Sequence, residues 1–318
     1  MVRLGVLGAG SHSSSNHGPA LQRCRDEQPE RIELAAVCDL DVERARRYAA
    51  RFGFARVYAD LERMVAAERL DGLVAVTPVE ATAELAARIA RLGVPLAIEK
   101  PPARTPLAVR RLRDELLSTG TPHMVSLNRR FSPALQRARE WLAGRQPPAV
   151  ALSRMLRHDR REAGFPYDTG IHAVDAVVCF LGEPVQVRAT RRPVGAQGTE
   201  LVVAQAGFAG GGTALFCMAP AAGAVEETLE LVGDEYDIQI DLWQCAVRIR
   251  QADQPVLAWQ AAPGTPPWES NGTLAETRAF VHAVETGAGW WPDLGEAAWS
   301  SGLAHGICAG LDGTLPVP

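Results

Sequence analysis

Short apolar runs alternate with amphipathic segments over the first 121 residues. The segments carry apolar side chains at helical spacing, as at Leu85, Ile89 and Leu92. The runs are apolar on both faces, which is typical of parallel strands covered by helices on both sides. The pattern predicts strands at residues 3–7, 32–38, 72–76 and 94–98, with 124–127 next, and helices at 42–52, 61–68, 82–92 and 107–118. Residues 1–121 are therefore expected to form an α/β domain with a doubly wound parallel sheet.

The pattern changes from about residue 122. Strand-like runs follow one another with turn signals between them, such as Gly210-Gly211-Gly212 and Gly233-Asp234. This spacing predicts an α+β domain over residues 122–318 with a mostly antiparallel sheet. The expected strands are 185–190, 201–208, 213–218, 228–232, 238–243 and 246–250, and the expected helices are 133–143, 171–181, 274–285 and 294–308.

Bulk composition excludes several classes of partner. A chain of 318 residues with 47% hydrophobic residues is long enough for about two domains with ample cores. The net charge is -4 and no basic stripe is present, so nucleic acid is not an expected partner. No apolar run reaches the roughly 20 residues that span a bilayer, so no membrane association is expected. A small molecule remains as the expected partner.

The cysteines indicate a reducing compartment. Six are present, none in a CxxC pair, and several lie in apolar runs such as Val177-Val178-Cys179-Phe180. Buried free thiols explain this pattern. Because the first strand begins at the second residue, no signal peptide is expected before it. The sequence predicts a cytoplasmic protein.

The turn after the first strand has the form of a nucleotide loop. Gly8-Ala9-Gly10 follows the strand, and a tight turn that approaches a pyrophosphate needs residues without a Cβ. The pyrophosphate would lie on amide groups at the start of the next helix. We expect cofactor contacts from Gly8, Gly10, Ser11, His12 and Ser13, where Ser13 takes the place of a third glycine. An ordinary turn between strand and helix is the alternative.

The end of the second strand carries a candidate ribose ligand. A carboxylate at Asp39 accepts hydrogen bonds from ribose hydroxyls and repels a 2′-phosphate, which favours NAD. The number of residues between the glycines and Asp39 is larger than usual. An extended Ser-rich loop with a turn at residues 27–30 would explain the longer spacing. Arg44 and Arg46 lie nearby and keep NADP open as the alternative cofactor. Asp39 as a plain turn residue is also open.

The histidines of the loop do not predict a metal site. His12 and His17 lack a cysteine or carboxylate at a spacing that would complete a ligand set, so no metal is expected. Contact with phosphate, or no ligand at all, is the preferred interpretation.

Two further strands end in polar residues that suit the same edge of the sheet. Thr77-Pro78 ends one strand and Glu99-Lys100 ends the next. Open parallel sheets bind ligands at the carboxyl ends of their strands, so Lys100 is expected in the nicotinamide crevice. A cation there stabilises the alkoxide of a hydride-transfer reaction. A solvated lysine is the alternative.

A second candidate group opens a helix about seventy residues later. Asp168 and His172 are four residues apart, which on a helix places both on one face. An imidazole titrates near neutral pH and suits proton transfer. Asp168 would orient the ring or bind a substrate hydroxyl, and Asp175 competes for that role. A capped helix with a structural histidine is the alternative.

Basic residues on the second domain are candidate substrate contacts. They are Arg129, Arg154, Arg157 and His158. If they converge, an anionic or phosphorylated substrate fits. A charged, exposed strand face is the alternative.

Together these segments resemble the glucose–fructose oxidoreductase / inositol dehydrogenase family (Gfo/Idh/MocA). The resemblance covers nearly the whole chain, is strongest over the first 180 residues and is thin after 190. It is carried by Gly8-Ala9-Gly10, Asp39, Thr77-Pro78, Glu99-Lys100-Pro101, Asn128-Arg129-Arg130-Phe131-Ser132-Pro133 and Asp168-Thr169-Gly170-Ile171-His172.

The resemblance implies a Rossmann domain followed by a domain with a large, open, mainly antiparallel sheet that often builds homodimers or homotetramers. It implies Lys100, Asp168 and His172 as the catalytic trio. With Arg129 and Arg157 from the basic candidates above, these three residues are the expected substrate contacts. The cofactor contacts add Asp39, Thr77, Pro78, Glu99 and Lys100 to the loop residues.

The expected reaction is NAD(P)-dependent hydride transfer between nicotinamide and a secondary alcohol or ketone of a sugar, cyclitol or related polyol. Three alternatives stay open: NAD-dependent glycoside cleavage with transient oxidation, imine reduction, and a non-catalytic nucleotide-sensing regulator.

The chain departs from the family pattern at three places. Ser13 replaces the third glycine, and Val79-Glu80-Ala81-Thr82 stands where the family commonly has a histidine after the Thr-Pro motif. The loop after Gly10 is one residue longer than is typical. These departures concern the pose of the cofactor more than the chemistry.

Overall fold

The computed structural model describes residues 1–158, 160, 164–194 and 199–316. By their contacts the residues form two compact units, Met1–Leu127 with Pro267–Ala297, and Asn128–Pro266 with Ala298–Pro318. The sequence-based division places a single boundary at residue 121, whereas the first unit here also takes up a segment near the C-terminus. The boundary of independently folding domains stays a prediction.

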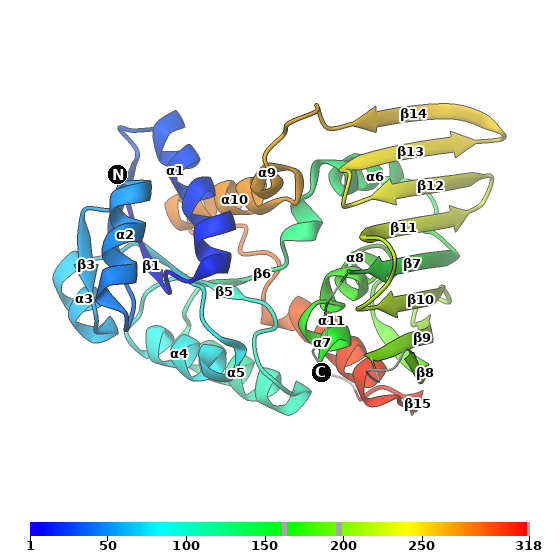
Figure 1. The fold of residues 1–318 in the computed structure, drawn as a ribbon, viewed down its shortest axis with the longest axis horizontal. Coiled ribbons are helices and arrows are strands. Elements are labelled where there is room, and N and C mark those ends of the chain that lie inside the picture. The colour runs from blue at the N-terminus through cyan, green and yellow to red at the C-terminus, as the bar shows by residue number, and fades with distance from the viewer. Residues whose placement is uncertain (159, 161–163, 195–198, 317–318) are drawn as a thin grey trace. The chain divides into compact units, whose positions relative to one another are not determined.

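The first unit is built on a six-stranded parallel sheet with the order β3-β2-β1-β4-β5-β6 (Figure 1). The order reverses between β1 and β4, so their carboxyl ends form the topological switch point where such sheets bind ligands. The strands are β1 (Val2–Leu7), β2 (Ile32–Cys38), β3 (Arg56–Tyr58), β4 (Gly72–Ala75), β5 (Leu96–Glu99) and β6 (His123–Ser126). The doubly wound parallel sheet is confirmed, and β3 is a strand that the hydrophobic pattern did not indicate.

Helices cover both faces of this sheet, as Figure 1 shows for α1 and α10 on one side and α4 and α5 on the other. They are α1 (Gly18–Glu27), α2 (Val42–Phe52), α3 (Leu61–Glu68), α4 (Val79–Arg91), α5 (Pro106–Thr119), α9 (Pro267–Ser270) and α10 (Thr273–Thr286). α2 and α3 begin where the sequence predicts, because Asp41 and Asp60 cap them by accepting hydrogen bonds from Arg44 N (3.0 Å) and Arg63 N (2.8 Å).

The segment after the nucleotide loop corrects the expectation of an extended Ser-rich loop. It is helical from Ser11, and residues Ser13–His17 form a π-helical turn, η1, that runs directly into α1. π-Helical turns accommodate one extra residue within an α-helix. Pro19 lies at the start of α1, where it lacks an N–H and its ring crowds the carbonyl four residues earlier. If the loop is one residue longer than the family pattern, as the sequence predicts, this wider helical turn accommodates that residue.

The second unit is built on a nine-stranded sheet with the order β14-β13-β12-β11-β7-β10-β9-β8-β15. Among the strand pairs in the described residues, only β7 and β10 run parallel. The strands are β7 (Val150–Leu156), β8 (Pro184–Val194), β9 (Thr199–Phe208), β10 (Thr213–Ala219), β11 (Glu226–Gly233), β12 (Tyr236–Asp241), β13 (Ala246–Gln251), β14 (Gln254–Gln260) and β15 (Asp312–Thr314). The predicted large, mainly antiparallel sheet is confirmed.

Helices pack on one face of this sheet and leave the other open. α6 contacts β12 and β13, and α8 contacts β7 and β11 (Figure 1). The helical elements are η2 (Asn128–Phe131), α6 (Pro133–Leu142), α7 (Phe165–Asp168), α8 (Ile171–Leu181) and α11 (Leu294–Ala309). The covered face holds one continuous apolar core, to which β10 contributes Ala214, Phe216 and Met218.

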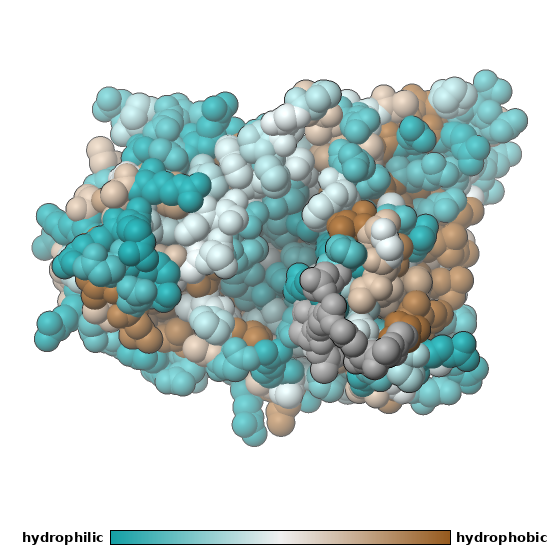
Figure 2. Space-filling model, in the orientation of Figure 1, coloured by the Kyte–Doolittle hydropathy of each residue, from teal (hydrophilic) through white to brown (hydrophobic). Residues whose placement is uncertain are grey.

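The open face carries apolar side chains among polar ones. Leu152 on β7 lies beside Leu215 on β10, and both are exposed, as is Val203 on β9. Figure 2 shows hydrophobic surface in brown along this sheet. A hollow of about 460 Å³ lies nearby, lined in part by Leu152, Glu230 and Arg248. Across the described part of the chain, no helix combines the length and the apolar character needed to cross a membrane.

Candidate functional site

Gly8 and Gly10 of the nucleotide loop are glycines for different structural reasons. Gly8 has a φ of +99°, its N–H donates to the carbonyl of Cys38 (2.8 Å), and a Cβ there would overlap the carbonyl oxygen of Val76. At Gly10, no described atom lies within 4 Å of the position that a Cβ would take. Gly8 is needed by the fold itself, whereas the open side of Gly10 fits the close approach of a pyrophosphate.

The helix that follows begins at the nucleotide loop. Helical structure begins at Ser11, and the first N–H groups of a helix have no acceptor within it. The Ser13 side chain does not face this end, because it is fully buried and its Oγ donates to the Tyr48 hydroxyl (3.0 Å). The helix begins with Ser11 and His12, and Ser13 links it to α2 by its hydrogen bond to Tyr48.

Asp39 is buried at the end of β2 and is held by four donors. One oxygen accepts from Ala9 N (2.8 Å) and Arg44 Nε (3.1 Å), and the other from Asp41 N (2.9 Å) and Arg44 Nη2 (2.6 Å). Burial opposes ionisation, but these hydrogen bonds prevail and lower the pKa of Asp39. Arg44 thus supplies two of the four hydrogen bonds that hold the Asp39 carboxylate at the end of β2.

Thr77 and Pro78 shape the start of α4. The Thr77 hydroxyl lies 3.0 Å from that of Thr82, which also donates to the carbonyl of Pro78 (3.0 Å). Pro78 is the N-cap residue of α4, immediately after β4. This turn lies at the switch point, as the sequence predicts for a segment beside the cofactor.

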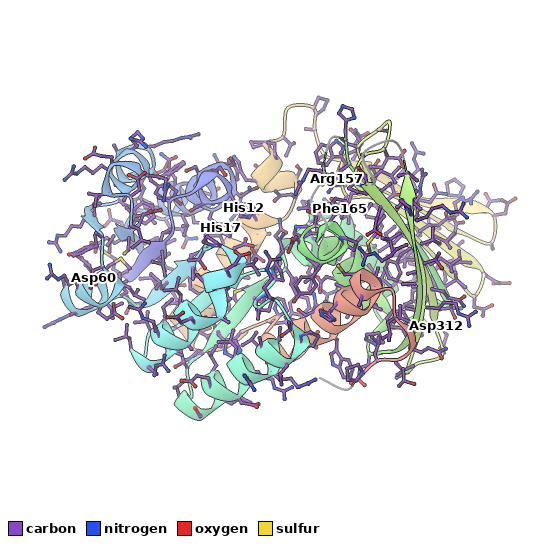
Figure 3. The ribbon with its side chains drawn as sticks, turned by 60° about the horizontal axis from the view of Figure 1, so that its bottom comes forward. His12, His17, Asp60, Arg157, Phe165 and Asp312 are labelled. Carbon is purple, nitrogen blue, oxygen red and sulfur yellow. The ribbon has the colours of Figure 1, made fainter. Side chains whose placement is uncertain are left out.

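Glu99 joins β5 to the nucleotide loop. Its Oε1 lies 3.0 Å from Nε2 of His12 and 2.9 Å from Nε2 of His17, and Figure 3 labels both rings. Glu99 is buried, and burial opposes ionisation, but the two imidazoles hold the pKa of its carboxyl well below the usual value. Lys100 follows at the end of β5 and is half-buried.

The composition of the chain also singles out Lys100, and the motif-based prediction did not use this signal. The chain has 33 lysines and arginines together, and Lys100 is the only lysine, which leaves 32 arginines. Elsewhere arginine serves wherever a cation is needed. An ammonium is a compact point charge that can lose its proton, whereas a guanidinium stays charged. The only lysine of the chain thus lies at the carboxyl end of β5.

The helix expected to carry both Asp168 and His172 is broken between them. Asp168 ends α7, and His172 lies in the first turn of α8 after Thr169 and Gly170. Gly170 is required because a Cβ there would crowd the Pro166 carbonyl at 2.5 Å and the Met218 sulfur at 2.7 Å. The one-face argument for a continuous helix is therefore wrong. Both side chains are half-buried.

Asp175 does not compete for the histidine. Its carboxylate binds the Arg130 guanidinium at 2.8–3.1 Å and accepts from Ser300 Oγ (2.6 Å), all fully buried. This ion pair joins η2, α8 and α11 in the interior of the second unit. Arg130 and Asp175 are structural, which leaves Asp168 as the carboxylate of the motif.

Arg129 and Arg157 meet on one buried carboxylate. Glu227 accepts from Arg129 Nε (2.6 Å) and Arg157 Nη2 (2.5 Å), while the arginine side chains are 12% and 11% exposed. Burial opposes ionisation of Glu227, but the guanidiniums lower its pKa. Figure 3 labels Arg157, whose guanidinium also lies 5.3 Å from the Trp243 ring centroid. The two predicted substrate contacts are thus held together.

The other two candidate substrate contacts, Arg154 and His158, have different partners from Arg129 and Arg157. Arg154 pairs with Glu226 (3.1 Å) on the open side of the sheet, and His158 Nδ1 lies 3.3 Å from the carbonyl of Ala222. Sequence reasoning missed Arg160, whose Nη2 donates to Thr169 Oγ1 (3.2 Å) inside the Asp168–His172 motif. No short-range sequence pattern links Arg160 to Thr169, so this contact could not be predicted from the sequence.

Comparisons with known proteins agree with this geometry. Residues 2–127 match the model of the oxidoreductase family with an NAD-binding Rossmann fold. The chain is 31% identical over 159 residues to D-apiose dehydrogenase of Paraburkholderia graminis, covering 50% of this chain and 38% of that protein. It is 30% identical over 199 residues to inositol 2-dehydrogenase of Rhizobium meliloti, covering 59% and 58%. The aligned regions thus span about two fifths to three fifths of these relatives.

The similarity of fold extends further than the similarity of sequence. The structure of a dehydrogenase from Chromobacterium violaceum superposes with a TM-score of 0.85 at 21% identity, covering 97% of this chain and 94% of that one. The family match and the six-stranded parallel sheet together show that residues 2–127 belong to the Gfo/Idh/MocA oxidoreductase family, with an NAD-binding Rossmann fold.

Proposed function

We propose that the protein is an NAD(P)-dependent dehydrogenase or reductase that acts on a secondary alcohol or ketone of a sugar, cyclitol or related polyol. The observation that carries this proposal is Lys100, the only lysine of the chain, at the carboxyl end of β5 in an NAD-binding Rossmann fold. The relatives named above support the substrate class.

The cofactor is bound by the first unit in this proposal. Nicotinamide, when bound, accepts or supplies the hydride. Gly8 permits the tight turn, and Gly10 lets the pyrophosphate approach the amides at Ser11 and His12. Asp39 accepts hydrogen bonds from the adenosine ribose, which favours NAD, with NADP as the alternative. Ser13, Thr77, Pro78 and Glu99 position these groups.

Three side chains carry the chemistry in this proposal. Lys100 donates a hydrogen bond to the reacting substrate oxygen and stabilises the negative charge that develops on it. His172 takes the hydroxyl proton during oxidation and returns it during reduction. Asp168 orients the imidazole or holds a neighbouring hydroxyl. Arg129 and Arg157, pre-oriented by Glu227, bind further substrate hydroxyls.

An absorbance screen at the nicotinamide band tests the reaction class. Purified protein is offered NAD or NADP with a panel of sugars, cyclitols and their keto forms, and calorimetry measures nucleotide binding. We expect net reduction of NAD with at least one polyol. Tight binding of NAD without net formation of NADH would favour the alternative of glycoside cleavage with transient oxidation. Binding without turnover of any substrate would favour a regulator.

Replacement of the single lysine tests its role. Lys100→Met removes the hydrogen bond and the charge, and we expect turnover to fall at least about 100-fold while NAD affinity changes little. Arg91→Met, which removes an exposed cation of α4, is the matched control and should keep activity. Turnover of Lys100→Met close to that of the control would contradict the assignment.

The single lysine also permits a chemical test. An amine-selective reagent can modify only Lys100 and the N-terminus, because no other lysine is present. We expect activity to fall in proportion to modification of Lys100 and substrate with NAD to protect it. Full activity at complete modification would exclude a role for the ammonium.

We further propose that the protein works in the cytoplasm as a homodimer or homotetramer, without nucleic-acid or membrane partners. All six cysteines are free, which supports a reducing compartment. The apolar side chains on the open face of the nine-stranded sheet support self-association.

A further inference from the structure

The wide helical turn after the nucleotide loop brings two histidines together. His12 and His17 are five residues apart, and five residues of an α-helix would separate their side chains by about 140° around the axis. The π-helical turn Ser13–His17 lies between the two histidines, and their ring centroids are 5.6 Å apart. Such turns are frequent at functional sites. The extra residue therefore pairs two imidazoles that a regular helix would hold apart.

Glu99 completes the group from a distant part of the chain. It lies 87 residues after His12 and 82 after His17, and its Oε1 is 3.0 Å and 2.9 Å from their Nε2 atoms. One donor atom from each residue lies within 4.8 Å of the other two. Ligand atoms bound to one zinc ion are about 3.0–3.4 Å apart. The two separations from Glu99 Oε1, 3.0 and 2.9 Å, are close to this range.

Burial and charge also suit a cation. Glu99 is buried beside the rings and brings one carboxylate oxygen within 3.0 Å of both Nε2 atoms. His17 is buried, whereas the His12 side chain is 51% exposed and opens the group to solvent.

We propose that His12, His17 and Glu99 bind a single divalent transition-metal ion of the zinc class. Two imidazoles and one carboxylate are a common ligand set for such ions, and three protein ligands leave a coordination position open. The sequence argument against a metal considered only residues close to the histidines, and Glu99 is supplied by the sheet. The site does not depend on the proposed oxidoreductase activity.

Metal titration of the nucleotide-free protein tests this site. The protein is stripped with a chelator and titrated with Zn²⁺ by calorimetry and with Co²⁺ by visible absorbance. We expect one equivalent to bind, and a Co²⁺ spectrum of nitrogen and oxygen ligands without the charge-transfer band of thiolates. Binding of more than one equivalent with a thiolate band would assign the metal to the cysteines and overturn the proposal.

Variants assign the ligands. His12→Gln removes the exposed ligand, and we expect the affinity for Zn²⁺ to fall at least about 100-fold, with unchanged circular dichroism. His282→Gln, an exposed histidine on α10, is the matched control and should bind as the parent protein does. An affinity of His12→Gln equal to that of His282→Gln, or no binding by the parent protein at 100 equivalents of Zn²⁺, would overturn the proposal.

Discussion

Arg44 binds the carboxylate of Asp39, which is expected to set the preference between NAD and NADP. It forms two hydrogen bonds to Asp39, at 2.6 and 3.1 Å, so this carboxylate carries a guanidinium where ribose hydroxyls would donate. A guanidinium can also bind the 2′-phosphate of NADP. Arg44 is thus placed to moderate the preference of Asp39 for NAD.

We expect Arg44→Ala to sharpen the preference for NAD. Without the guanidinium, Asp39 is free to accept from the ribose and repels a 2′-phosphate more strongly. The ratio of the dissociation constants for NADP and NAD should rise at least about tenfold, measured by calorimetry. Arg46→Ala, which removes an exposed arginine paired with Glu43, is the matched control. A ratio that is unchanged in Arg44→Ala would show that Arg44 does not take part in cofactor choice.

The buried carboxylate of Glu227 makes a residue-scale prediction about stability and pH. Its side chain is 1% exposed between Arg129 and Arg157, so Glu227→Gln leaves two guanidiniums without their counter-charge. We expect a loss of about 3–5 kcal/mol in the free energy of unfolding at pH 7. Glu226→Gln, which removes the partly exposed neighbour, should cost less than about 1 kcal/mol.

The same variant should respond to pH in a defined direction. A carboxyl whose pKa is lowered by folding stabilises the protein above the pKa of the unfolded chain, about 4.5, and this contribution is lost as the pH falls below it. The difference between the parent protein and Glu227→Gln should therefore be largest near neutral pH and shrink below about pH 4.5. Urea unfolding at several pH values measures it, and a constant difference would contradict the assignment.

At the scale of elements, the two glycines of the nucleotide loop are expected to have different roles, one in folding and one in cofactor binding. Gly8→Ala places a Cβ on the Val76 carbonyl at a φ of +99°, whereas Gly10→Ala places one in a space that no described atom occupies within 4 Å. We expect Gly8→Ala to lower the free energy of unfolding by more than about 1 kcal/mol. Gly10→Ala should keep the stability and weaken NAD binding. Equal losses of stability in both variants would contradict this division.

Elements with local signals were predicted closely. The bounds of α2, α3, α8 and β2 match the hydrophobic pattern to the residue. α2 and α3 have aspartate caps, and α8 ends at Gly182, which has a φ of +77°. The short strand β3 was missed because it is edge-located and only half-buried, so its sequence lacks an apolar run.

Two elements were misread because contacts beyond the local sequence decide them. The serines after Gly10 suggested a loop, but Ser13 is buried against Tyr48 and the segment is helical. The Asp168–His172 segment suggested one helix, but Gly170 lies against the Met218 sulfur of the sheet and the helix breaks there. Packing against another element decided both.

At the scale of the whole molecule, the open face of the nine-stranded sheet predicts self-association. Leu215 is 44% exposed and lies beside Leu152. We expect Leu215→Glu to shift the protein to a smaller species in light scattering coupled to size exclusion, because a buried charge opposes apolar contact. Leu117→Glu, on α5 of the other unit, is the matched control. If Leu215→Glu keeps the assembly of the control, this face is not the interface.

The sequence by itself determined the two kinds of sheet, the nucleotide loop and the strand ends that carry Asp39, Thr77 and Lys100. These features depend on periodicity and on local turn chemistry, which neighbouring residues specify. Only the tertiary structure decided how distant groups pair: Glu99 with His12 and His17, Arg130 with Asp175, and Arg129 and Arg157 with Glu227. Each buried charge needs a counter-charge, but which residue supplies it depends on which segments the fold packs together.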